Sequence, residues 1–213
     1  MSSGAGDPGI IDVPYFQQTR TATCGPACLM MVMNYWDSSF DLSRKMEFRL
    51  WTQSYSLFLL GGTFQYGLAS TAAAYGFHPE ISQKTGFSTE YLRFPQLATL
   101  IENMVSYKAR RMNIPIRYGS ENISVIRKAL SENIPPIVFI NLLPLLGENV
   151  LHWVVVTGLD EQLVHINDPY IPKGFLGKQK KNHPVPRDVF LKAMETQTGR
   201  IYRLPPCVIL IKP

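Results

Sequence analysis

The feature that most constrains this chain is a segment, from Gly25 to Trp36, whose residues are apolar on nearly every side. It contains Leu29, Met30, Met31, Val32, Met33 and Tyr35. Pro26 suits the first turn of a helix, because an N–H group there has no intrahelical acceptor to lose. A helix that is apolar almost all round has to be covered by other elements, so we expect it at the centre of the fold.

A cysteine, Cys24, stands at the start of this predicted helix. A thiol reacts as the thiolate, and its free pKa lies near 8.5. Unpaired backbone N–H groups and the helix dipole both stabilise negative charge at a helix N-terminus. An isolated cysteine is more often a capping or buried residue, but in this context we interpret Cys24 as a nucleophile. Gly25 is then expected to leave room for a substrate backbone.

A glutamine precedes Cys24 by six residues. A side-chain amide in this loop, together with the backbone N–H of the nucleophile, can donate to the oxyanion that forms when a carbonyl is attacked. Gln18 is the candidate for this role and Gln17 is its rival. A single loop glutamine is otherwise usually solvated.

A histidine, His152, begins the apolar segment Leu151–Leu159. A general base of this kind needs a third group to orient it. The following segment, Leu163–Asp168, predicts a hairpin with a turn at 160–162. A three-residue turn puts Asp168 on the face of His152, within side-chain reach, whereas a two-residue turn puts it on the opposite face. Asn167 is the weaker alternative for orienting the imidazole.

The remaining periodic segments place helices first and strands later. We expect helices within 40–60 and over 64–74, 94–107, 121–132 and 190–194, and strands over 137–143 and 207–211. This order indicates an α+β fold with an antiparallel sheet. His78 and His183 are expected in loops, and the basic segment 173–181 is expected to be a solvated loop or a flap.

Length and apolar content bound the class of protein. A chain of 213 residues is expected to form one domain, over 13–213, after a flexible leader at 1–12. The apolar run near 57–60 is too short to cross a membrane, so no membrane insertion is expected. Residues 1–9 lack the features of a signal peptide, and we therefore expect a cytoplasmic protein.

Cysteine count and charge exclude further classes. Three cysteines, Cys24, Cys28 and Cys207, make no disulfide framework, and Cys28 is expected to pack as a small buried hydrophobe. The histidines are scattered, so neither a metal nor a cofactor is expected. The formal charge of +5 is modest, and the basic residues at 108–111 and 173–181 favour a solvated face over nucleic-acid binding.

Taken together, the candidate residues resemble the C39-like branch of the papain-fold cysteine peptidases. The matching pieces are Val13-Pro14-Tyr15, Gln18, Cys24-Gly25-Pro26, His152 and Asp168-Pro169. The resemblance implies a papain-like fold in which a helical half carries Cys24 and a sheet half carries His152 and Asp168. It also implies thiol-dependent hydrolysis of a peptide or amide bond through an acyl-enzyme, with a peptide or protein as the substrate.

Two alternatives share these residues. One is an acyltransferase or transglutaminase-type enzyme, in which an amine replaces water as the acceptor of the acyl group. The other is a non-catalytic module that binds peptides in the same groove, because a fold does not guarantee a function. The sequence gives no indication of the oligomeric state.

Overall fold

The structure is a computed structural model that describes residues 9–54, 62–87, 95–119, 122–170, 180–196 and 204–213. Its helices are α1 (Cys24–Trp36), α2 (Arg44–Ser54), α3 (Gln65–Ala74), α4 (Pro95–Arg111), α5 (Asn122–Ser131), α6 (Leu143–Leu146) and α7 (Arg187–Glu195). Its strands are β1 (His78–Gln83), β2 (Ile116–Tyr118), β3 (Ile137–Asn141), β4 (Leu151–Leu159), β5 (Leu163–Asn167), β6 (His183–Pro186) and β7 (Cys207–Lys212).

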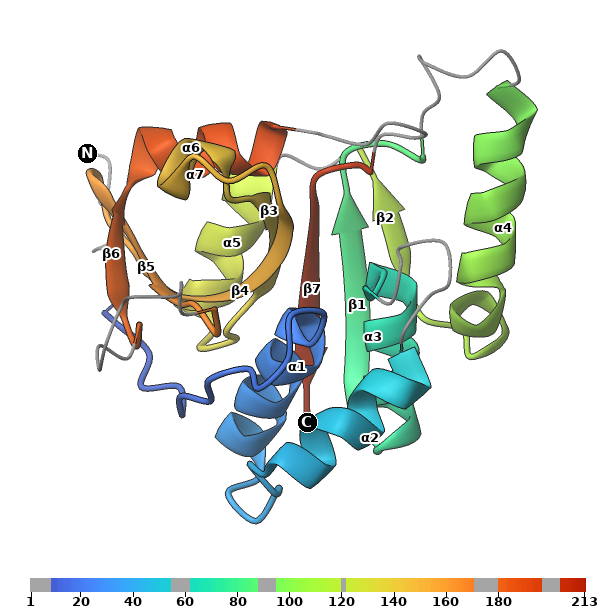
Figure 1. The fold of residues 1–213 in the computed structure, drawn as a ribbon, viewed down its shortest axis with the longest axis horizontal. Coiled ribbons are helices and arrows are strands. Elements are labelled where there is room, and N and C mark those ends of the chain that lie inside the picture. The colour runs from blue at the N-terminus through green and yellow to red at the C-terminus, as the bar shows by residue number, and fades with distance from the viewer. Residues whose placement is uncertain (1–8, 55–61, 88–94, 120–121, 171–179, 197–203) are drawn as a thin grey trace, which may run out of the picture.

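These strands form one sheet in the order β2-β1-β7-β3-β4-β5-β6 (Figure 1). All neighbouring pairs are antiparallel except β1 and β2, which run parallel. Helix α1 packs against β4, α3 packs against β1, and α7 packs against β3. The predicted α+β class is confirmed, and the parallel β1–β2 pair is an addition to it.

The central helix lies where its composition predicts. Residues 25–33 of α1 are all buried, and Ala27 to Met33 have no exposed surface. Gly25, however, is packed inside the protein. A Cβ added there would lie 2.2 Å from Thr63 Oγ1 and 3.0 Å from Leu68. The expectation that Gly25 leaves room for a substrate is therefore wrong, because Thr63, two residues before α3, and Leu68 of α3 fill that space.

Two strands begin at histidines that we expected in loops. His78 begins β1 and His183 begins β6, so both expectations are wrong. Proline makes these strands hard to predict from the sequence, because it cannot donate a hydrogen bond to a neighbouring strand and is typical of edge strands and strand ends. Strand β6 is an edge strand with the sequence HPVP, and Pro79 of β1 lies beyond the register in which β2 pairs with it.

The register of the β4–β5 hairpin decides which face Asp168 occupies. Leu159 pairs with Val164 at the turn, but Val155 pairs with Asn167 further along, because the register shifts between Val156 and Gly158. Continued by one residue, this register sets Asp168 opposite Val154, on the face that also carries His152. Without the shift, Asp168 would face the other side, so the irregularity brings the two side chains together.

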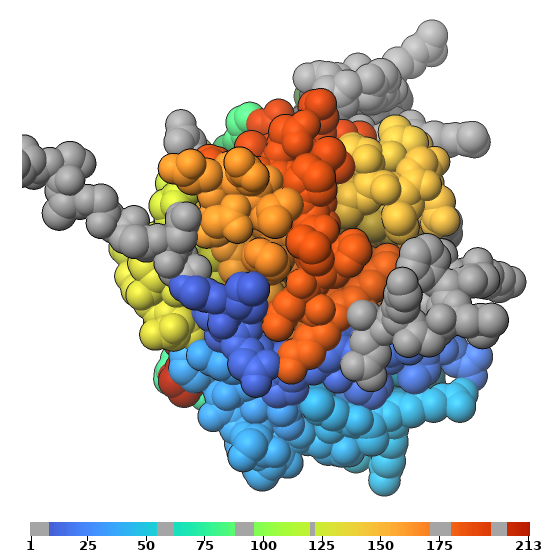
Figure 2. Space-filling model, turned by 90° about the vertical axis from the view of Figure 1, so that its left-hand side faces the viewer, coloured from blue at the N-terminus to red at the C-terminus, as the bar shows by residue number. Residues whose placement is uncertain are grey.

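The N-terminal segment joins the sheet before the predicted boundary at residue 12. Ile11 is buried and donates its N–H to Thr157 O at 2.7 Å. Asp12 Oδ1 forms an ion pair with Lys181 Nζ at 2.7 Å. Figure 2 shows this segment, in dark blue, against the orange surface of the β5–β6 region. Residues 1–8 of the expected leader lie outside the described residues.

Candidate active site

Cys24 is the first residue of α1 and is partly exposed to solvent. Hydrogen bonding and charge from the side chain of His152 favour its thiolate form, and so do backbone groups of Trp153 and Gly25. The structure therefore brings together a thiol from the helix N-terminus and an imidazole from β4. Cys28, one turn further along α1, is fully buried, as expected, and its thiol donates to Trp153 O at 3.2 Å.

His152 and Asp168 form a buried pair. Nε2 of His152 lies 2.7 Å from Oδ1 of Asp168, and the two residues are 3% and 2% exposed. Because Nε2 faces the carboxylate, Nδ1 is the ring nitrogen that remains for Cys24. The ring of Tyr170 packs edge-on against the imidazole, with centroids 5.9 Å apart. The imidazole is thus held between an acid and a thiol and is covered on one side by an aromatic ring.

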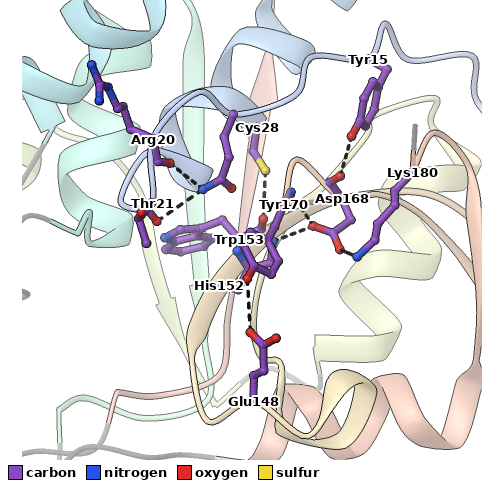
Figure 3. Close-up of polar contacts among 11 residues, drawn as sticks. Tyr15, Arg20, Thr21, Cys28, Glu148, His152, Trp153, Asp168, Tyr170 and Lys180 are labelled. Carbon is purple, nitrogen blue, oxygen red and sulfur yellow. Dashed lines mark hydrogen bonds and ion pairs between the residues drawn. The ribbon is translucent and has the colours of Figure 1, made fainter. Parts of the chain in front are cut away.

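Asp168 is fixed by contacts from several segments (Figure 3). Its Oδ1 accepts the Tyr170 N–H at 2.9 Å, and its Oδ2 accepts from Lys180 Nζ at 2.9 Å. Its backbone oxygen accepts from the Tyr15 hydroxyl at 2.9 Å, which links it to the Val13-Pro14-Tyr15 segment. The alternative, Asn167, is engaged elsewhere. Its amide donates to Val13 O at 3.1 Å and accepts from Asn182 N at 2.8 Å.

Gln18 lies on the loop that leads to α1. Its backbone N–H donates to Pro169 O at 3.1 Å, which places the loop beside the turn that carries Asp168. Its side-chain Nε2 donates to Arg20 O at 2.7 Å and to Thr21 O at 3.3 Å. An amide nitrogen has two hydrogens, so Gln18 would have to release one of these bonds to donate to an oxyanion. The rival, Gln17, is exposed.

The same loop is fastened by a buried acid of α2. Glu47 is 1% exposed, and its Oε1 accepts from Thr19 N at 2.7 Å and from Thr23 Oγ1 at 2.5 Å. Its Oε2 accepts from Thr19 Oγ1 at 2.5 Å. Thr19 and Thr23 are the first and last residues between Gln18 and Cys24. Glu47 therefore binds both ends of this loop.

The sequence matches the "Peptidase_C39 like family" over residues 13–204. This match spans most of the chain and includes every candidate residue. The chain belongs to the C39-like peptidase family. No curated protein matches the sequence.

Solved structures of C39 peptidases have the same fold as this C39-like protein. A C39-like peptidase from Bacillus anthracis superposes with a TM-score of 0.53 at 15% identity, covering 96% of this chain and 98% of that one. The peptidase domain of Streptococcus ComA, a bifunctional ABC transporter of a quorum-sensing pathway, gives 0.50 at 18% identity, with coverages of 93% and 96%. A double-glycine-motif protease from an AMS/PCAT transporter, solved with its leader peptide, gives 0.50 at 17%, with coverages of 96% and 94%.

The electrostatics of the C39-like site favour charged side chains. Burial alone would raise the pKa of Cys24, but the hydrogen bond and charge of His152 outweigh it and lower that pKa below its ordinary value. Burial alone would lower the pKa of His152, but Asp168 and Cys24 raise it to about 10. Burial alone would raise the pKa of Asp168, but His152 and Lys180 lower it to about 2. This pattern favours the charged form of each group, a thiolate, an imidazolium and a carboxylate.

The other two thiols differ from Cys24 in this respect. Both are fully buried, and burial raises the pKa of Cys28 and of Cys207. A neutral thiol away from solvent is unreactive. Chemistry at sulfur in this protein is therefore favoured at Cys24.

Two residues of the site were not predicted from the sequence. Lys180 belongs to the basic segment 173–181 that we expected to be a solvated loop or a flap. It is 7% exposed and pairs with Asp168, so the solvated alternative is wrong for this residue. Glu47 lies within the helical segment expected in 40–60, where an acid in a first turn is ordinary. Neither residue carries a spacing signal that connects it to Cys24 or Asp168.

Two further observations concern the described part of the chain. None of its helices is long and apolar enough to cross a membrane. A cavity of about 740 Å³ adjoins the loop before Cys24 and is lined by residues 19–23 together with Arg44, Lys45, Glu47, Phe48 and Trp51 of α2.

Proposed function

We propose that this protein is a cysteine peptidase that hydrolyses peptide bonds through a covalent acyl-enzyme at Cys24. The observation that carries the proposal is the chain of contacts from Cys24 to His152 to Asp168, in which each group favours the charged form of the next. A nucleophile beside a base that is oriented by a third group is the arrangement that nucleophilic catalysis requires.

In the first step, the Cys24 thiolate attacks the carbonyl carbon of the scissile bond. The negative charge that develops on the carbonyl oxygen lies near the N-terminus of α1, where the backbone N–H of Cys24 is the first donor to it. Gln18 becomes a second donor to this oxygen when its amide turns from Thr21 O. The His152 imidazolium then gives its proton to the leaving amine, and a thioester remains on Cys24.

In the second step, neutral His152 removes a proton from water, which attacks the thioester and releases the acid product. Asp168 keeps Nδ1 directed at the sulfur and stabilises the imidazolium each time it forms, without itself being protonated. Because the pKa of Asp168 is lowered to about 2, it remains a carboxylate throughout.

Peptides are the proposed substrates. The family match and the solved relative that holds a leader peptide support this choice. The cavity lined by residues 19–23, on the loop that leads to the nucleophile, offers room for residues of an extended chain. Since Cys24 has to be reduced to react, we place the activity in a reducing compartment, the cytoplasm.

An ester substrate tests the acyl-enzyme directly. With p-nitrophenyl acetate, the parent should show a burst of nitrophenol and an acetylated Cys24 by peptide mass analysis. Cys24→Ser and His152→Ala should abolish the burst. Cys28→Ser serves as the matched control, because its hydroxyl can still donate to Trp153 O, and it should keep the burst.

The fate of the acetyl group separates hydrolysis from acyl transfer. Release as acetate in the presence of glycinamide supports the hydrolase, whereas transfer to the amine in preference to water supports a transferase. Cleavage of an unfolded protein such as casein by the parent, and not by Cys24→Ser, then tests for a peptidase. Absence of any acetyl-Cys24 would contradict the proposal and favour a peptide-binding module.

A further inference from the structure

The carboxylate of Asp168 is shared between two cationic partners. Oδ1 lies 2.7 Å from Nε2 of His152, and Oδ2 lies 2.9 Å from Nζ of Lys180. Asp168 N also donates to Lys180 O at 3.1 Å, so backbone and side chain bind the same residue. The lysine thus fixes the rotation of the carboxylate that faces the imidazole (Figure 3).

The burial of Lys180 makes this contact unlike a surface ion pair. Its side chain is 8% exposed, and that of Asp168 is 3% exposed. Burying an ammonium group is costly unless it is paired and hydrogen-bonded. Nζ also lies 5.9 Å from the centroid of the Tyr170 ring, the same ring that packs on His152. This buried ammonium group lies at the carboxylate that contacts the imidazole.

The charges of the site balance only when Lys180 is counted. In the resting site the thiolate and Asp168 are negative, and the imidazolium and Lys180 are positive. In the tetrahedral intermediate the oxyanion replaces the thiolate, and the sum is unchanged. In the acyl-enzyme the sulfur and the imidazole are neutral, and Lys180 still balances Asp168. Without the lysine, every one of these buried states would carry an extra negative charge.

We propose that Lys180 is a positioning residue for the reaction: its ammonium group holds the Asp168 carboxylate toward His152 and keeps the buried site electrically neutral. This inference rests on the proposed function. Lys180 acts through Asp168 and does not touch the reacting atoms. It should therefore affect the protonation of His152 and the rate of acylation more than substrate binding.

Among the described residues, the other ionisable groups near Asp168 do not supply the same charge. Those that interact with Asp168 or with Lys180 are Cys28, His152, Tyr15, Tyr170 and His183, and Glu148 contacts Tyr170. The only permanent cation in this set is Lys180. Burial and then proximity to Lys180 lower the pKa of His183, which favours the neutral form of that histidine.

The test compares three replacements of Lys180 with the parent. Lys180→Met keeps the aliphatic stem and removes the charge, and Lys180→Gln keeps a donor without the charge. Lys180→Arg keeps both, and a cavity of about 130 Å³ beside Lys180 and Asp168 gives room for the larger head group. The pH dependence of Cys24 alkylation by iodoacetamide is measured for each, together with kcat and KM for the ester.

Loss of the Lys180 cation should stabilise the His152 imidazolium and so raise the pKa of His152. The alkaline limb of the alkylation profile, where the imidazolium loses its proton, should then move up by about 1 pH unit. Lys180→Met should lose about tenfold in acylation rate with little change in KM, because a loosened carboxylate orients the imidazole less well. Lys180→Gln should show the pH shift with a smaller loss of rate. Lys180→Arg should stay close to the parent in both measurements.

A double-mutant cycle separates positioning from a purely structural role. Lys180→Met should have little further effect on acylation when combined with Asp168→Asn, and this pair leaves no unpaired buried charge that would prevent folding. Unchanged pH profiles in the neutral variants, or additive losses in the cycle, would overturn the inference while the proposed function stands. A parent without a low-pH thiolate would refute the proposed function instead.

Discussion

Removal of the Glu47 carboxylate should loosen the loop that leads to the nucleophile. Glu47 accepts three hydrogen bonds, from Thr19 N, Thr19 Oγ1 and Thr23 Oγ1, at 2.5 to 2.7 Å. Each bond to a charged acceptor contributes about 1.5–3 kcal/mol, and a buried donor left without a partner costs about 1–3 kcal/mol. The hydroxyls can rotate to other acceptors, but the Thr19 N–H, in a partly buried contact, cannot. The lost bond and the unpaired donor together should lower the free energy of unfolding of Glu47→Ala by about 2.5–6 kcal/mol.

The glutamine variant distinguishes hydrogen bonding from general packing. In Glu47→Gln the amide oxygen can still accept from Thr19 N and Thr23 Oγ1, and the NH₂ group can donate to the Thr19 hydroxyl. Only the charge is lost, so we expect a loss of about 1 kcal/mol. Glu132→Gln and Glu132→Ala are matched controls, because this acid is half exposed and its ion pair with Lys128 spans 3.9 Å. Both should change stability by less than about 0.5 kcal/mol.

Urea unfolding followed by tryptophan fluorescence measures these differences, and the ester burst reports on the site in the same samples. Glu47→Ala should lose the burst amplitude at temperatures where the remainder of the fold is intact, because Gln18 and Cys24 flank the loosened loop. Equal stability of Glu47→Ala and Glu47→Gln would refute the reasoning from hydrogen bonds. A normal burst in folded Glu47→Ala would show that the loop does not depend on this acid.

Three other outcomes follow from the structure. Gly67→Ala should be destabilised by about 1–3 kcal/mol in urea unfolding, since its Cβ would lie 2.3 Å from Ser54 O, whereas Gly9→Ala, with open space around it, should match the parent. Thiol titration with a disulfide reagent should modify one cysteine in the native protein and all three in denaturant; modification of Cys28 in the native state would contradict the packing. The pKa of His152 is raised to about 10. The stability that the parent gains from its imidazolium, relative to His152→Gln, should therefore be fully present below pH 6.5 and lost as the pH rises through about 10. Urea unfolding of both proteins at the two ends of this range measures the loss.

Local patterns predicted most of the fold. The apolar helix beginning at Cys24, the hairpin of β4 and β5 and the helices α3 and α5 lie within one or two residues of their expected bounds. Each has either a continuous apolar run or an amphipathic pattern, together with a clear start or stop residue. Strands β1, β2 and β6 were missed because they are short or contain prolines, and only pairing with neighbours distant in sequence makes them strands.

The site was predictable only in part, for reasons of geometry. The expected contact of Asp168 with His152 depended on a turn length that the sequence left open. The observed hairpin reaches the same register by a different turn followed by an irregularity at Val156–Gly158, which the sequence does not signal. Lys180 and Glu47 act through long-range contacts, and a buried lysine looks like a solvated one in a basic segment. Gln18 was placed on the correct loop, and its role as an oxyanion donor stays a prediction.

The most direct test of the central claim is the pH dependence of Cys24 alkylation by iodoacetamide, followed by peptide mass analysis with Cys28 and Cys207 as internal references. If Cys24 forms an ion pair with His152, it should react selectively well below pH 8.5, the free value of a thiol, and this low-pH reactivity should disappear in His152→Ala. Slow and equal reaction of all three thiols, or a profile unchanged by His152→Ala, would contradict the account.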